Sequence, residues 1–98
     1  MLRRTIGALA LCALVGCCKT EEIPTQTRRL YSRSAHDRNE AALALAKCGS
    51  PEVDRAVGRL SELLYDENVG VQSSAAYALR KIDSEHARRA LERATKRR

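Results

Sequence analysis

The chain has 98 residues, enough for one small domain, and its formal net charge of +6 favours anionic partners. Apolar residues make up 44% of the sequence, but the only aromatics are three tyrosines. The core must therefore be built from Ala, Leu, Val and Ile. The aromatic surfaces on which single-stranded nucleic acid stacks are lacking, so we expect no nucleic-acid partner.

Residues 1–16 have the pattern of a signal peptide. Two arginines precede an apolar segment of about ten residues, which is too short to span a bilayer, since spanning needs roughly 20. The segment Leu14-Val15-Gly16-Cys17 resembles the lipobox of bacterial lipoproteins, Leu-x-Gly/Ala-Cys. The resemblance implies cleavage before Cys17 and acylation of Cys17, which would anchor the protein in the cell membrane. In a Gram-negative host the implied location is the periplasmic face of the outer membrane. The alternative is an ordinary signal peptide with an incidental cysteine.

Residues 17–33 are predicted to form the lipidated cysteine and a flexible tether. This stretch is polar, contains Pro24 and shows no apolar periodicity. Leu30 and Tyr31 could begin to pack against the first helix, but we do not expect them to form a full element.

The four cysteines do not suggest a disulfide framework or a metal site. Cys12 leaves with the signal peptide and Cys17 is acylated, while Cys18 has no assigned role. Cys48 takes the place of Ile82 in the repeat described next, which favours a small apolar core residue over a redox role. No spacing of Cys and His resembles a metal-binding motif.

The rest of the chain, 34–98, is one unit written twice, with repeats at 34–67 and 68–98. Shifting the sequence by 34 residues places Ala41 on Ala75 and Arg59 on Arg93, with nine identities in the twenty pairs from Ala41/Ala75 to Leu60/Ala94. A fixed period of this size is typical of solenoid proteins. Because two repeats are fewer than the usual three, self-association is a possible outcome.

Each repeat is predicted to contain two helices. Ser34 and Asn68 are equivalent N-caps, and Ser50-Pro51 is a second start signal. The helices should cover about 34–47, 51–65, 69–82 and 85–95. At 100° per residue, the third helix places five apolar side chains on one inward stripe, with corresponding stripes on the others; these five are Val71, Ala75, Ala78, Leu79 and Ile82.

The apolar pattern resembles the HEAT repeat family, in the short form also found in phycobilin-lyase-like proteins. The residues that carry the resemblance are Leu60, Leu63, Leu64, Asp66, Asn68, Val71, Gln72, Ala75, Ala76, Ala78, Leu79 and Ile82. It implies an all-α fold, a short right-handed α-solenoid of two helical hairpins. Gln72 stands where the family usually has Arg, which should weaken an ion pair with Asp66. The tetratricopeptide repeat has the same period, but its aromatic framework is absent here.

No catalytic motif is present, so we expect neither enzymatic activity nor a cofactor. The repeat places four arginines in equivalent rows on the second and fourth helices, namely Arg55, Arg59, Arg89 and Arg93. By resemblance, these helices line the concave surface that binds partners. We therefore expect a scaffold that holds an acidic protein segment or an anionic envelope polymer on this surface. The alternatives are an ordinary solvated helix face, an assembly lipoprotein whose basic face contacts anionic lipid, and an accessory subunit of an envelope enzyme.

Overall fold

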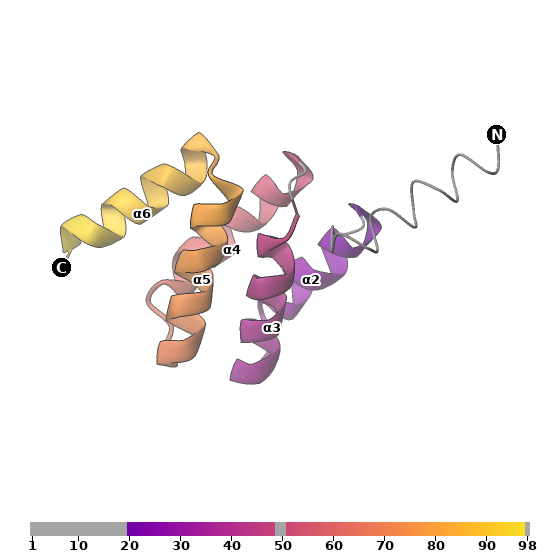
Figure 1. Cartoon of the computed structure of the whole chain (residues 1–98). Helices are drawn as coiled ribbons and strands as arrows, with labels where there is room; N and C mark the ends of the chain where they lie inside the picture. Colours follow the sequence, from indigo (N-terminus) through magenta and orange to yellow (C-terminus); the bar gives the residue numbers. More distant parts are fainter. Residues whose placement is uncertain (1–19, 49–50, 98) are drawn as a thin grey trace.

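The computed structural model describes residues 20–48 and 51–97, and every regular element in those ranges is a helix (Figure 1). The all-α class predicted from the sequence is confirmed. The predicted signal peptide, 1–16, and the predicted lipidation site, Cys17, lie outside the described residues. Within these ranges, no helix combines the length and apolar character needed to cross a bilayer. The elements in chain order are η1 (Thr20–Glu22), α2 (Ile23–Arg29), α3 (Ala35–Ala46), η2 (Pro51–Ala56), α4 (Val57–Leu63), α5 (Val69–Ile82) and α6 (Glu85–Arg97).

The helices form two layers. α3 and α5 lie side by side and make the most extensive contact between any two elements; we call this pair the A layer (Figure 1). α2 packs against α3 and η2, while α4 and α6 pack against α5 and against each other. We call α2, η2, α4 and α6 the B layer. In the second predicted hairpin α5 packs directly on α6, whereas the two helices of the first, α3 and α4, both pack against α5.

Polar caps start three of the helices, as their sequences predict. The Ser34 hydroxyl accepts the Asp37 amide at 3.3 Å, and the Asn68 side chain accepts the Val71 amide at 3.0 Å. The Ser84 hydroxyl caps α6 in the same way. These bonds satisfy amides that have no acceptor within the helix. The predicted second helix differs, because its first six residues form the 3-10 turn η2 before α4 begins.

Small and aliphatic side chains fill the space between the layers. Val71, Ala75, Ala78 and Leu79 of the predicted stripe are buried, whereas Ile82 is half-buried. The corresponding residues of α4, including Val57 and Leu60, are fully buried. Alanine at many contacts allows the helix backbones to approach closely, which compensates for the lack of large aromatic residues.

The predicted flexible tether is wrong from residue 20 onward. η1 and α2 are helical, and Ile23 and Leu30 are only 4% and 0% exposed in the common core. Ile23, Thr27 and Leu30 follow an i, i+4, i+7 pattern, which places them on one helix face. That face packs on α3, so α2 adds a fifth helix ahead of the first predicted hairpin. Only two of its core-facing residues, Ile23 and Leu30, are strongly apolar, so the helix could not be recognised in a mostly polar segment.

Candidate functional site

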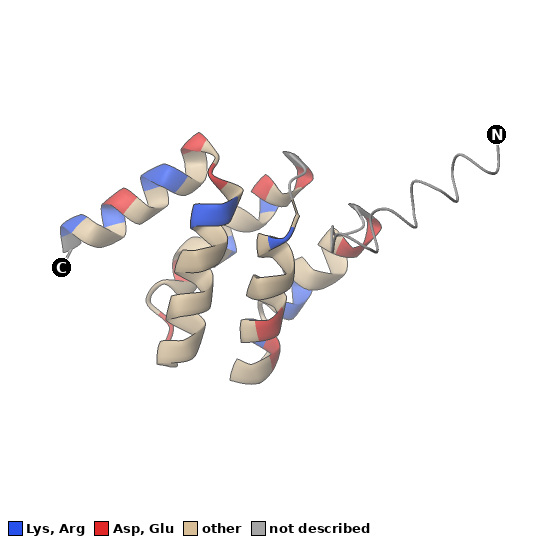
Figure 2. Cartoon of the chain, in the orientation of Figure 1, with Lys and Arg blue, Asp and Glu red and all other residues tan. Residues whose placement is uncertain are grey.

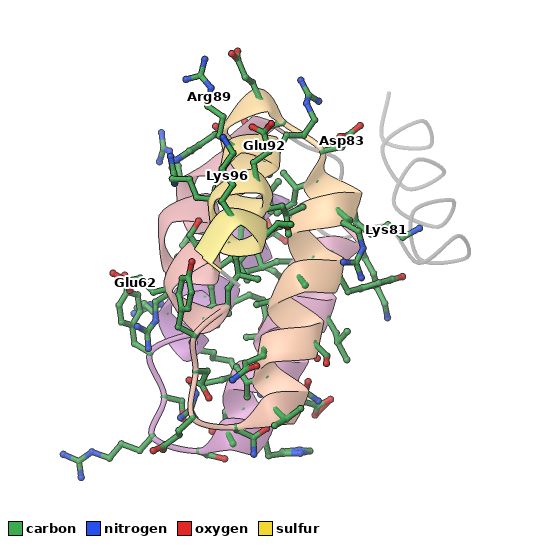
Figure 3. The ribbon with its side chains drawn as sticks, turned by 90° about the vertical axis from the view of Figure 1, so that its left-hand side faces the viewer. Glu62, Lys81, Asp83, Arg89, Glu92 and Lys96 are labelled. Atoms are coloured by element: carbon green, nitrogen blue, oxygen red, sulfur yellow. The ribbon has the colours of Figure 1, made fainter. Side chains whose placement is uncertain are left out.

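The four predicted arginines all lie in the B layer. Arg55 belongs to η2, Arg59 to α4, and Arg89 and Arg93 to α6. α4 and α6 contact each other, so the repeat brings the two rows together on neighbouring helices. Figure 3 shows Arg89, Glu92 and Lys96 along α6, with Glu62 of α4 on the same side of the molecule. We call the exposed part of α4, η2 and α6 that carries the four arginines the basic surface.

Arg59 is held within the fold. Its Nε donates to the Leu30 carbonyl at 3.1 Å, and its Nη1 lies 3.0 Å from Glu62 Oε1. The guanidinium also lies 4.4 Å from the centre of the Tyr31 ring. Leu30 is the C-cap of α2, so Arg59 supplies a donor to a helix end that would otherwise lack one. Its side chain is 23% exposed, which leaves little of it for a partner.

The other three arginines are exposed. Arg89 Nη2 lies 2.6 Å from Glu85 Oε1 one turn earlier, and both side chains are about two-thirds exposed. Arg55 lines a hollow of about 310 Å³ between α2 and η2, together with Ile23 and Thr27. Neither Arg55 nor Arg93 forms an ion pair with any residue that the structure describes. The basic surface therefore offers two uncommitted guanidiniums and one in a weak surface pair.

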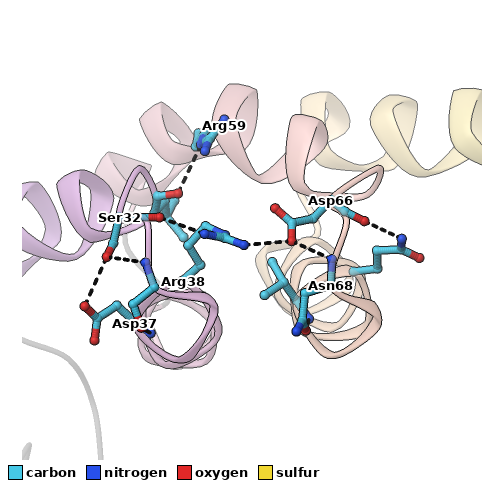
Figure 4. Close-up of polar contacts among 10 residues, drawn as sticks. Ser32, Asp37, Arg38, Arg59, Asp66 and Asn68 are labelled. Carbon is cyan, nitrogen blue, oxygen red and sulfur yellow. Dashed lines mark hydrogen bonds and ion pairs between the residues drawn. The ribbon is translucent and has the colours of Figure 1, made fainter.

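A separate polar network joins the two repeats (Figure 4). Arg38 is 6% exposed, and its Nη2 donates to Asp66 Oδ2 at 3.1 Å. Its Nη1 donates to the Ser32 carbonyl at 2.8 Å, and Asp66 Oδ2 also accepts the Asn68 amide at 3.0 Å. Gln72 is the repeat equivalent of Arg38, and Asp66 is the repeat equivalent of Ser32. The Gln72 side chain donates to the Asp66 backbone carbonyl, just as Arg38 donates to the Ser32 carbonyl. The sequence analysis considered residue 72 as the ion-pair partner of Asp66. In the structure that partner is Arg38 of the preceding repeat.

The charge state of Asp66 follows from these neighbours. Burial alone would raise the pKa of the Asp66 carboxyl. The Asn68 amide bond, together with the hydrogen bond and charge of Arg38, outweighs burial and holds that pKa below its usual value of 3.8. Arg59 adds a smaller effect of the same sign. Asp66 is thus an ionised structural group between the repeats, and its carboxylate accepts hydrogen bonds from Arg38 and from the Asn68 amide.

Cysteine and histidine positions add little chemistry. Cys48 is 4% exposed, as expected for a core residue, but it is disulfide-bonded. The prediction that the cysteines form no disulfide framework is therefore wrong at Cys48. His36 and His86 each lie near one carboxylate, Glu40 at 3.2 Å and Asp54 at 3.9 Å. No group of three His, Cys, Asp or Glu side chains that could hold a metal ion occurs in the described ranges.

The comparison with protein families gives one match, to the family described as HEAT repeats, over residues 23–98. The match begins at the first residue of α2 and continues to the last residue of the chain, so it includes the helix that sequence reasoning took for a tether. No curated protein and no solved structure matches the chain. The two-layer packing, the repeated caps and the matched span agree, and the chain belongs to the HEAT repeat family.

Proposed function

We propose that this protein is a lipid-anchored, non-enzymatic interaction module of the cell envelope. Its anchor is Cys17, on the basis of the lipobox-like segment that ends there. Its basic surface, with Arg55, Arg89 and Arg93 as the contacting arginines, binds an acidic segment of a partner protein. HEAT repeats commonly mediate contacts between proteins, and this supports the general class of function.

The main support for the proposal is that the exposed arginines of the basic surface have few ion pairs within the protein. Arg55 and Arg93 form no ion pair within the described part of the chain, and Arg89 has only an exposed pair with Glu85. An exposed pair of this kind contributes roughly 0.3–0.5 kcal/mol, so a partner carboxylate can replace Glu85 at little cost. Guanidinium groups bind carboxylates through two parallel hydrogen bonds, which gives such contacts both strength and direction.

Arg59 has a different part in the proposal. Because its Nε is bonded to the Leu30 carbonyl, it positions α2 beside α4 rather than binding the partner. The four-arginine row predicted from the sequence therefore becomes a three-arginine surface with Arg59 as its support.

The proposal is tested by binding of a fluorescent oligoglutamate peptide, followed by anisotropy at increasing salt. Arg55→Ser combined with Arg93→Ser should weaken binding and lower its salt dependence, with an unchanged circular dichroism spectrum. The charge-matched control combines Lys47→Ser with Arg80→Ser, both exposed in the A layer. Equal loss in both double variants would mean that net charge alone attracts the peptide, and the basic surface would lose its assigned role.

A further inference from the structure

A second exposed surface lies on the opposite side of the molecule from the basic surface. Leu43 of α3 and Tyr77 of α5 are separated by the 34-residue period, and they are 37% and 42% exposed. Lys47 and Lys81 are equivalent in the same way and follow them by about one helical turn. In Figure 3, Lys81 points away from the B layer, on the side opposite Glu62. We call Leu43, Tyr77, Lys47 and Lys81 the outer A face.

The outer A face combines apolar and cationic groups that the fold does not use. The Lys81 ammonium lies 5.6 Å from the centre of the Tyr77 ring, and neither lysine forms an ion pair with a described residue. Beside them is an open hollow of about 470 Å³, whose lining includes Leu43, Lys47 and Tyr77 as well as Arg29 and Glu40. Glu40, the acidic residue in that lining, is paired with His36.

The position of α2 decides which occupant suits this face. The described part of the chain begins at Thr20, three residues after Cys17. Three residues span at most about 11 Å when fully extended, so an acyl anchor on Cys17 would hold the domain against the bilayer surface. The start of α2 lies against η2, which follows the end of α3 where Lys47 stands (Figure 1). The anchor therefore holds the end of the molecule that carries η2 and Lys47 near the membrane.

We propose that the outer A face rests on the surface of an anionic membrane, and this proposal depends on the lipid anchor of the proposed function. Leu43 and Tyr77 enter the headgroup region, where tyrosine and aliphatic side chains are stable. Lys47 and Lys81 contact lipid phosphates while their aliphatic stems cover the apolar pair. Arg89 and Arg93 of the basic surface lie on α6, away from the anchored helix α2, and remain accessible to a protein partner.

Distribution of charge over the chain agrees with this orientation. Figure 2 shows basic positions at the C-terminal ends of α3 and α5, where Lys47 ends the first helix and Arg80 and Lys81 lie in the last turn of the second. The surface of an anionic bilayer is complementary in charge to Lys47 and Lys81.

The test uses the acylated full-length protein in vesicles that contain phosphatidylglycerol and brominated phosphatidylcholine. Because the chain has no tryptophan, Leu43→Trp introduces a single reporter, and Tyr65→Trp provides the matched reporter on the B layer. Brominated acyl chains should quench the fluorescence of the Leu43→Trp variant and leave that of the Tyr65→Trp variant unchanged. Lys47→Gln with Lys81→Gln should abolish the quenching, whereas Arg89→Gln with Arg93→Gln should not.

The outcomes separate this proposal from the one on which it rests. An acylated chain with equal quenching at both reporters, or with none at Leu43→Trp, overturns the orientation and leaves the anchor intact. Protection of the Leu43→Trp reporter from a water-soluble quencher, without quenching by brominated lipid, overturns the membrane contact and assigns the face to a second copy of this chain. A chain without acyl groups that does not associate with vesicles removes both proposals.

Discussion

Replacing Arg38 with alanine should destabilise the protein more than its polar character suggests. Arg38 and Asp66 are 8% and 11% exposed in their side chains, and their ion pair links α3 to the turn before α5. Alanine at position 38 leaves the Asp66 carboxylate buried with the Asn68 amide as its remaining donor to the side chain. It also removes the donor to the Ser32 carbonyl.

The expected loss can be compared with the whole stability of the domain. Breaking a buried ion pair by removing one partner typically costs about 3–5 kcal/mol. A domain of this size has a total stability on the order of 5–10 kcal/mol, at roughly 0.05–0.15 kcal/mol per residue. We therefore expect Arg38→Ala to lose about 3 kcal/mol, a large share of the total. Asp66→Asn in the Arg38→Ala background should restore part of it, because the unpaired charge is then gone.

The pH dependence has a defined sign. The pKa of Asp66 in the folded protein lies below its ordinary value of 3.8. The unfolded chain therefore binds more protons between these two values, so folding stability is fully present above about pH 4 and falls as pH drops through the folded pKa. Without Arg38, burial of the carboxyl and its hydrogen bond from the Asn68 amide remain, while the hydrogen bond and the charge of Arg38 are lost. In Arg38→Ala the pKa of the folded Asp66 carboxyl therefore moves back toward its unfolded value, and the acid-side loss of stability should be smaller than in the wild type.

Urea unfolding followed by far-ultraviolet circular dichroism, from pH 3 to pH 7, measures both effects. Destabilisation below about 1 kcal/mol in Arg38→Ala at pH 7, with the same acid-side profile as the wild type, would refute the assigned role of the pair. A matched control is Arg33→Ala, because Arg33 is exposed in the turn before α3 and should change stability by less than about 0.5 kcal/mol.

Three further substitutions test the assignment of core and surface. Leu79→Asp should abolish cooperative thermal unfolding, because it puts an unpaired charge where the side chain is fully buried; a retained sharp melt would contradict the core assignment. Ile23→Ser should lower the free energy of unfolding by about 2 kcal/mol because a buried apolar side chain is lost, whereas Thr25→Ser on the exposed side of α2 should not. Equal effects of the two variants in urea titrations would mean that α2 does not pack on the core. Arg59→Ala should lower the free energy of unfolding by about 1–2 kcal/mol because it leaves the Leu30 carbonyl without its donor, and Arg93→Ala should lower it by less than about 0.5 kcal/mol. A larger loss in Arg93→Ala than in Arg59→Ala would argue against the structural role of Arg59.

The repeat itself made most of the fold predictable. Capping residues at Ser34 and Asn68 mark helix starts directly, because few side chains can accept an amide from the first turn. The apolar stripe of α5 was equally readable, since Val71, Ala75 and Leu79 recur at helical spacing and are all buried. Both signals are local, so a single sequence contains them in full.

α2 was missed because its signal is not local. Only Ile23 and Leu30 of its core-facing side are strongly apolar, and Pro24 beside them suggested a linker. Pro24 is in fact compatible with the first turn, where a backbone donor is not needed. What stabilises α2 is α3 and Arg59, which lie farther along the chain.

For the basic surface, the repeat predicted which helices lie side by side but not the environment of each arginine. Equivalent positions in the repeat do bring the arginine rows onto neighbouring helices of one layer. Which arginines are uncommitted depends on Leu30, Tyr31 and Glu85, and their distances to Arg59 and Arg89 follow only from the packed structure. The Arg38–Asp66 pair escaped notice for the same reason, since it joins residues of two different repeats.

The anchor at Cys17 is tested most directly by intact-mass spectrometry and detergent partitioning of the wild type beside Cys17→Ser, both expressed in a bacterial host. We predict a wild-type chain that begins at Cys17, carries acyl groups and enters the detergent phase, and a variant that lacks all three properties. Spectra with and without reductant would also report whether the Cys48 disulfide persists in the acylated chain. A wild-type protein that carries no acyl group and stays in the aqueous phase would contradict the anchor, and with it the assignment of this HEAT-repeat protein to the envelope.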